Sequence, residues 1–121
     1  MKPEVNTDFS TKVLGDITSR AKAARDEVAK RQEEYYAAMK KLSIFKAHRN
    51  KALAKFESIK RRSLTGDESE LRSAKANYNS INSVYSDSEI NTDVLRSGLM
   101  DRIFFAGKMN NQVAIANAML D

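Results

Sequence analysis

The sequence predicts an all-α fold: a long helical hairpin or coiled-coil-like bundle, with one very long N-terminal helix and one or two shorter helices packed back on it. Three observations predict this class. The 121 residues include four glycines and one proline, far fewer than turn-rich β sandwiches and barrels need. Apolar residues recur every three or four positions along most of the chain. The length fits one domain, and the absence of cysteine excludes disulfides and thiolate metal sites.

The first predicted helix covers about residues 8–62, where no proline interrupts the chain and Thr7 or Asp8 can cap the start. The apolar residues follow a heptad repeat, in which positions a and d of every seven residues form one seam along the helix. This seam is rich in alanine and is broken by two arginines. At 1.5 Å per residue this helix is about 80 Å long, so we expect the rest of the chain or other subunits to cover it. The a positions are Ala21, Val28, Tyr35, Leu42, Arg49 and Phe56, and the d positions are Ala24, Arg31, Ala38, Phe45, Ala52 and Ile59.

A reversal between antiparallel helices is predicted at residues 63–67. Thr65 and Glu68 have the spacing of a capping box, in which the hydroxyl and the carboxylate each bind a backbone amide at the start of a helix. Arg61 and Arg62 fall in the last turn of the preceding helix, where its dipole favours cations. The segment 63–67 therefore ends one helix and starts the next.

The second half is predicted as two helices, about 67–86 and 88–120. Ser86-Asp87-Ser88-Glu89 predicts a break between them, and Ser97-Gly98 offers a kink or the start of a separate helix. Phe104 and Phe105 point to different sides of the last helix, which is therefore either buried on most of its circumference or part of an oligomer contact. We favour the oligomer contact. The predicted core seam or self-association residues are Val28, Tyr35, Leu42, Phe45, Phe56, Ile59, Ile103, Phe104, Phe105, Met109, Val113 and Leu120.

Charge is distributed unevenly. The net charge of +5 combines an excess of eight positive charges in residues 1–62 with an excess of three negative charges in residues 63–121. Either the two halves pair with each other, within the chain or between subunits, or the basic half binds an anionic partner. Residues 40–62 hold nine basic side chains and one acidic one, and the solvated face of a bundle is the competing, favoured interpretation. The candidates for contact with nucleic acid or an acidic membrane are Lys46, Arg49, Lys51, Lys55, Lys60, Arg61 and Arg62.

The patterns expected of an enzyme or a metal site are missing from the sequence. The single imidazole, His48, lies among cations, and the glycines are isolated, so no phosphate-binding loop is present. Residues 87–93 begin like a calcium loop, but Thr92 replaces its glycine and Gly98 its final glutamate. We therefore predict no enzymatic activity, no cofactor, no metal and no small-molecule substrate.

The leading prediction is a structural or assembly protein that associates through helix–helix contacts with itself or with a helical protein partner. It would serve as a subunit of a filament, a secretion apparatus or a phage-type assembly. A nucleic-acid or anionic-surface binding protein is the alternative, and a small secretion chaperone is a further one. The N-terminal residues lack a secretory signal pattern, and no run of about 18 apolar residues occurs. We expect cytoplasmic synthesis, with signal-independent export or incorporation into an extracellular assembly left open.

Overall fold

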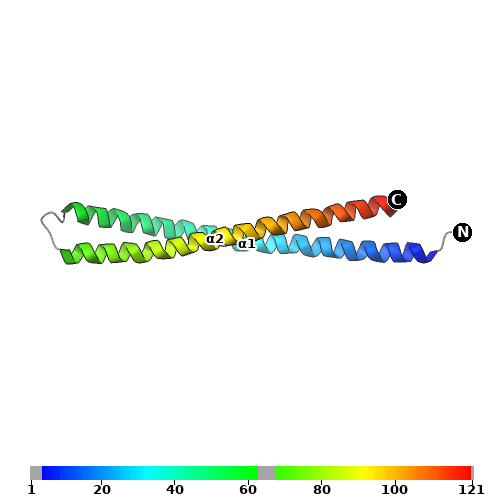
Figure 1. Cartoon of the computed structure of the whole chain (residues 1–121), viewed down its shortest axis with the longest axis horizontal. Coiled ribbons are helices and arrows are strands. Elements are labelled where there is room, and N and C mark those ends of the chain that lie inside the picture. Colours follow the sequence, from blue (N-terminus) through cyan, green and yellow to red (C-terminus); the bar gives the residue numbers. More distant parts are fainter. Residues whose placement is uncertain (1–3, 63–67, 121) are drawn as a thin grey trace. The chain divides into compact units, whose positions relative to one another are not determined.

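The structure is a computed structural model that describes the backbone of residues 4–62 and 68–120 and the side chains of residues 11–62 and 68–119. All described backbone is α-helical and forms two helices, α1 (Glu4–Arg62) and α2 (Glu68–Leu120). The two helices pack against each other as an antiparallel hairpin (Figure 1). The predicted all-α hairpin is confirmed.

The chain divides into two compact units, each made from one stretch of either helix. Unit 1 comprises Met1–Glu34 and Arg96–Asp121, and unit 2 comprises Tyr35–Leu95. In Figure 1 the blue part of α1 lies beside the orange and red part of α2 in unit 1, and the cyan-to-green part of α1 lies beside the green-to-yellow part of α2 in unit 2.

The prediction of two helices in the second half is wrong, and the single helix found there is nearly as long as α1 rather than much shorter. α2 has 53 residues against 59 in α1, and it passes as one helix through residues 86–89 and through Ser97-Gly98. Its packed face continues across the polar run, because Ser88 is half-buried and Thr92 is buried, at 6% exposure. The Thr92 hydroxyl donates a hydrogen bond of 2.7 Å to the Ser88 carbonyl, so this buried polar group has a partner without ending the helix.

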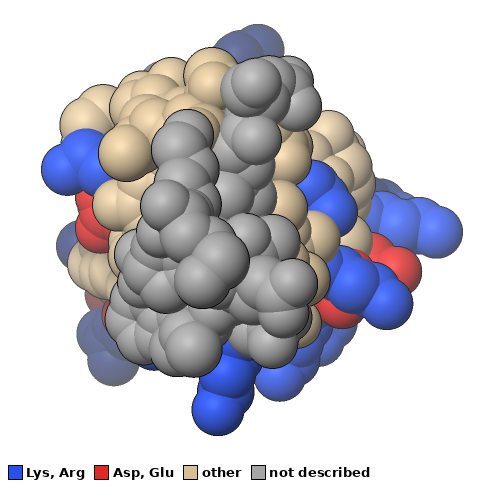
Figure 2. Space-filling view, turned by 90° about the vertical axis from the view of Figure 1, so that its right-hand side faces the viewer, with Lys and Arg blue, Asp and Glu red and all other residues tan. Residues whose placement is uncertain are grey.

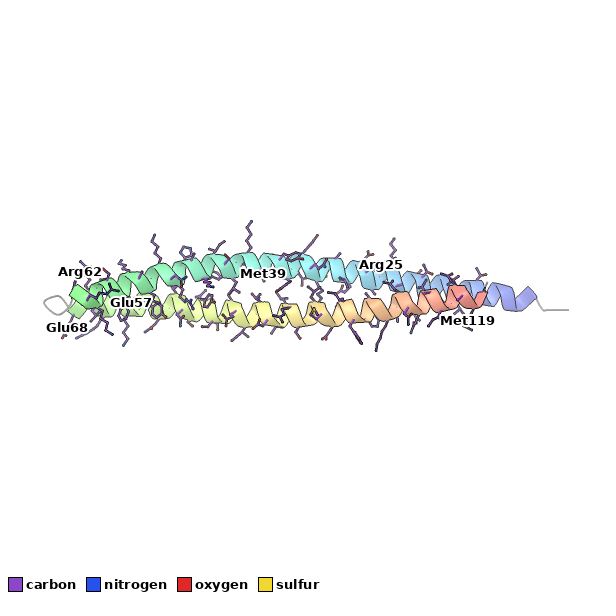
Figure 3. All side chains as sticks on the ribbon, turned by 90° about the horizontal axis from the view of Figure 1, so that it is seen from above. Arg25, Met39, Glu57, Arg62, Glu68 and Met119 are labelled. Atoms are coloured by element: carbon purple, nitrogen blue, oxygen red, sulfur yellow. The ribbon has the colours of Figure 1, made fainter. Side chains whose placement is uncertain are left out.

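The two helices end and begin on either side of the predicted reversal at residues 63–67. α1 begins at Glu4 rather than near residue 8, and it ends at Arg62, with basic residues in its last turn. Residues 63–67, including the proposed capping Thr65, lie outside the described part of the chain, and Glu68 is the first residue of α2. The Arg62 guanidinium lies 3.7 Å from the Glu70 carboxylate, and Figure 3 shows Arg62 and Glu68 at the same end of unit 2.

The packed face of α1 follows one heptad register. All twelve of the a and d positions from Ala21 to Ile59 are buried or half-buried, including Arg31 and Arg49. Small side chains at these positions let the helix backbones approach closely, but each contributes little apolar area. The buried apolar residues are Ala21, Ala24, Ala38, Ala52, Ile59, Ala74, Leu99 and Ala106.

Each unit adds a specific contact to this alanine-based packing. In unit 1 the Arg25 guanidinium donates a hydrogen bond of 3.1 Å to the Asn110 side-chain oxygen and so ties α1 to α2. In unit 2 the rings of Phe56 and Tyr78 stack, with centroids 6.4 Å apart and planes inclined by 9°. Among the described residues no large side chain is fully buried, so these contacts act alongside a thin core.

Candidate interaction surfaces

A group of exposed apolar side chains surrounds α2 in unit 1. We call Met100, Ile103, Phe104 and Phe105 the apolar collar. Phe104 is 67% exposed and Met100 is 59% exposed, and the other two are also classed as exposed. Consecutive helical residues point about 100° apart, so these four positions cover much of the circumference that α1 leaves open. Apolar groups gathered in this way are typical of interaction surfaces.

Charged groups border the apolar collar. The Lys108 ammonium lies 4.8 Å from the centroid of the Phe104 ring, a cation–π distance. An open groove of about 270 Å³ runs beside Phe105 and is lined also by Arg31, Gly98, Asp101 and Arg102. The collar therefore presents apolar surface with mixed charge at its edge, which resembles the rim and centre of protein interfaces.

Glu27 and Arg31 form an ion pair on α1 in unit 1. The Arg31 Nε donates a hydrogen bond of 3.0 Å to the Glu27 carboxylate, at the favourable four-residue spacing. This hydrogen bond lowers the pKa of the Glu27 carboxyl, burial opposes the shift, and the charges of Arg31, Lys30 and Arg102 add to it. Arg31 is thus held on the packed face with its charge paired.

The predicted seam residues divide into two groups in the structure. Ile59 is buried, and the half-buried residues are Val28, Tyr35, Leu42, Phe45, Phe56, Met109 and Val113. Ile103, Phe104 and Phe105 are exposed, so the less favoured alternative, a last helix buried on most of its circumference, does not hold at these three positions. The side chain of Leu120 lies outside the described set.

Arg49 belongs to the packed face of unit 2 and not to the open surface. Its guanidinium lies 4.3 Å from the centroid of the Tyr85 ring, and its Nη2 donates a 3.1 Å hydrogen bond to Asn50. Its Nε is buried and has no hydrogen-bond partner. A hydrogen bond to Glu89 raises the pKa of the Tyr85 hydroxyl; burial and the Glu89 charge act the same way, and the Arg49 charge opposes them. The side chains of Arg49, Tyr85 and Glu89 thus form a polar layer across this seam.

The other predicted anionic-partner residues are exposed on α1. Among the residues that the structure describes, Lys46, Lys51, Lys55 and Arg61 make no ion pair. Lys60 and Arg62 are also exposed but have interactions, of which the Arg62–Glu70 pair is one. Figure 2, seen from the end that carries the termini, shows lysine and arginine side chains of the chain projecting outward on several sides, with acidic side chains beside some of them. Arg49 thus lies at its heptad seam position, the other six cations are exposed, and their contact with an anionic partner stays a prediction.

Within residues 11–62 and 68–119, no group of three or more histidine, aspartate or glutamate side chains is arranged to hold a metal ion. Neither described helix contains a stretch long and apolar enough to cross a membrane.

No protein-family model, curated protein or solved structure matches this chain. Functional inference therefore depends on the surfaces of the two units and on their chemistry.

Proposed function

We propose that this chain is a non-enzymatic assembly protein that associates with further copies of itself through helix–helix contacts. The apolar collar carries the proposal, because two phenylalanines, an isoleucine and a methionine are exposed at one level of α2. Burying a large apolar side chain contributes about 1.5–3 kcal/mol, so a partner that covered the collar would gain substantially.

The thin core supports the same proposal. Six of the eight buried apolar residues are alanines, and among the described residues no large side chain is fully buried. The chain has no cysteine, and its described residues offer no metal cluster, so neither common covalent nor metal cross-link reinforces the packing. Association of subunits is the remaining common way in which a small helical protein covers its apolar surface.

A second copy suits unit 1 electrostatically. Unit 1 contains ten basic and nine acidic residues, so two copies meeting there carry almost no net charge to repel each other. The mixed charges beside Phe105, from Arg31, Asp101 and Arg102, allow opposite charges to meet at the edge of a self-complementary contact.

The mass of the native particle tests this proposal, measured by sedimentation equilibrium over a wide concentration range. We expect a dimer or a larger assembly for the wild-type chain, and a shift of at least ten-fold toward higher concentration for Phe104→Gln, since about 1.4 kcal/mol corresponds to a factor of ten. Ile90→Gln is the matched control: Ile90 is a large exposed apolar residue two heptads before Phe104, and so on the same side of α2, but it belongs to unit 2.

Two results would contradict the proposal. One is a wild-type chain that remains a compact monomer at millimolar concentration. The other is an equal loss of association for Phe104→Gln and Ile90→Gln, which would show that association does not depend on the apolar collar.

A further inference from the structure

Unit 2 carries a second surface, of a different chemistry, on the outer side of α1. With the packed face at heptad positions a and d, positions f, c and g form a continuous strip about 100° wide along the helix. Between residues 40 and 62 this strip contains eleven residues, all exposed and none acidic. Its six cations, which we call the cationic stripe, are Lys40, Lys41, Lys51, Lys55, Arg61 and Arg62.

The residues between these cations leave the stripe open to a large partner. None of them is acidic, and the single acidic residue of this segment, Glu57, belongs to heptad position b, outside the strip. The stripe extends over 22 residue steps, or about 33 Å. The intervening residues are Ile44, Ala47, His48, Ala54 and Ser58.

α2 does little to neutralise the stripe. Lys55 lines a groove of about 610 Å³ with Ser73, Asn77 and Glu70 of α2, and His48 lines another with Ser80 and Val84. Of these α2 residues only Glu70 is acidic, and it pairs with Arg62. The serines and the asparagine are exposed hydroxyl and amide groups of the kind that donate hydrogen bonds to phosphate oxygens.

We propose that the cationic stripe of unit 2 binds double-stranded nucleic acid through its phosphates, without reading the base sequence. Its length is close to one turn of B-DNA, about 34 Å. Lysine supplies four of the six cations, and lysine acts on phosphate as a point charge rather than through a fixed bidentate geometry. Each neutralised phosphate releases counterions, which gives affinity independent of sequence.

The same surface is poorly built for the other polyanions. Within residues 40–62, all of which the structure describes, Ile44 is the one large apolar residue classed as exposed, whereas Phe45, Phe56 and Ile59 are buried or half-buried. A helix that inserts into a membrane interface needs a broad apolar face on its outer side. The strip also contains no phenylalanine, tyrosine or tryptophan, the large aromatic residues on which the bases of a single strand stack.

The test uses the full chain and a dye-labelled 20-base-pair duplex of arbitrary sequence, followed by fluorescence anisotropy between 50 and 200 mM KCl. If the five cations other than Arg62, which pairs with Glu70, neutralise five phosphates, the logarithm of affinity falls with the logarithm of salt with a slope of about −4.5, since each phosphate contributes about 0.9. We expect the double variant Lys51→Gln, Lys55→Gln to reduce the steepness of this slope by about 2 and to weaken binding at least ten-fold at 50 mM KCl.

A matched double variant, Lys46→Gln with Lys75→Gln, changes the net charge of unit 2 equally. Lys46 is at heptad position e of α1, away from the stripe, and Lys75 is on α2, next to the buried Ala74. We expect its slope to remain that of the wild type. Equal losses in the two double variants would overturn the proposal, because binding would then follow net charge alone. Binding that is absent at 50 mM KCl would also overturn it, as would tighter binding to phosphatidylserine-containing vesicles than to the duplex.

Discussion

The two units use the same packing and differ in what they present outward. Both join a stretch of α1 to a stretch of α2 through buried alanines, with one larger residue in each core, Leu99 in unit 1 and Ile59 in unit 2. Unit 1 is nearly neutral and exposes the apolar collar. Unit 2 holds eleven basic and seven acidic residues and exposes the cationic stripe. One packing scheme therefore supports two surfaces of different chemistry.

The largest expected effect comes from the two large core residues. Leu99→Ala in unit 1 and Ile59→Ala in unit 2 should each lower the free energy of unfolding by about 2–5 kcal/mol, because each leaves a cavity between the helices. Urea denaturation followed by circular dichroism measures both. Ile90→Ala, at an exposed position, should cost less than about 1 kcal/mol. A similar cost at all three positions would show that Leu99 and Ile59 do not form the stabilising core, and a large cost at only one of those two would show that the units do not share this packing.

A smaller effect is expected at the polar layer of unit 2. Arg49→Met replaces a half-buried cation whose Nε has no partner with a flexible apolar side chain, at the loss of the contact with the Tyr85 ring. Since replacement of desolvated charges by apolar groups is often neutral or stabilising, we expect the free energy of unfolding to rise by about 1 kcal/mol. Exposed Lys46→Met is the control, and a loss of more than about 1 kcal/mol for Arg49→Met would mean that the cation–π contact outweighs desolvation.

The smallest effects depend on pH and act at opposite ends of the pH range in the two units. The lowered pKa of Glu27 in unit 1 means that its stabilising contribution is present above the ordinary value of 4.5 and is lost as pH falls through the lowered value. The raised pKa of Tyr85 in unit 2 means that its contribution is present below 10.0 and is lost as pH rises through the raised value.

An NMR titration of the Glu27 carboxyl measures the first pKa shift. A titration of tyrosinate absorbance, compared between the wild type and Tyr85→Phe, measures the second. Arg31→Gln should return the Glu27 titration toward 4.5, because the hydrogen bond from Arg31 is the largest cause of the shift. An unchanged Glu27 titration in that variant would contradict this assignment. If the tyrosine that titrates above 10.0 in the wild type still titrates there in Tyr85→Phe, the raised pKa does not belong to Tyr85.

The repeat of alanine and larger apolar residues in α1 was sufficient to predict its packed face. The register from Ala21 to Ile59 could be identified because a helix places residues three and four apart on one side, whatever it packs against. The same reasoning failed near Ser86–Glu89. There the packed positions are Ser88 and Thr92, which resemble capping residues, and a hydrogen bond within the helix satisfies the buried hydroxyl.

The sequence by itself therefore determined that this protein is helical, where the packed face of α1 lies, and that its charge gathers in residues 40–62, because these properties follow from local spacing. Only the pairing of α1 with α2 decided that Arg49 turns to Tyr85 while Lys51 and Lys55 remain exposed. The same pairing left Phe104 and Phe105 uncovered. Exposure depends on which side chains of the neighbouring helix stand opposite each position, and the spacing of residues within one helix carries no information about them.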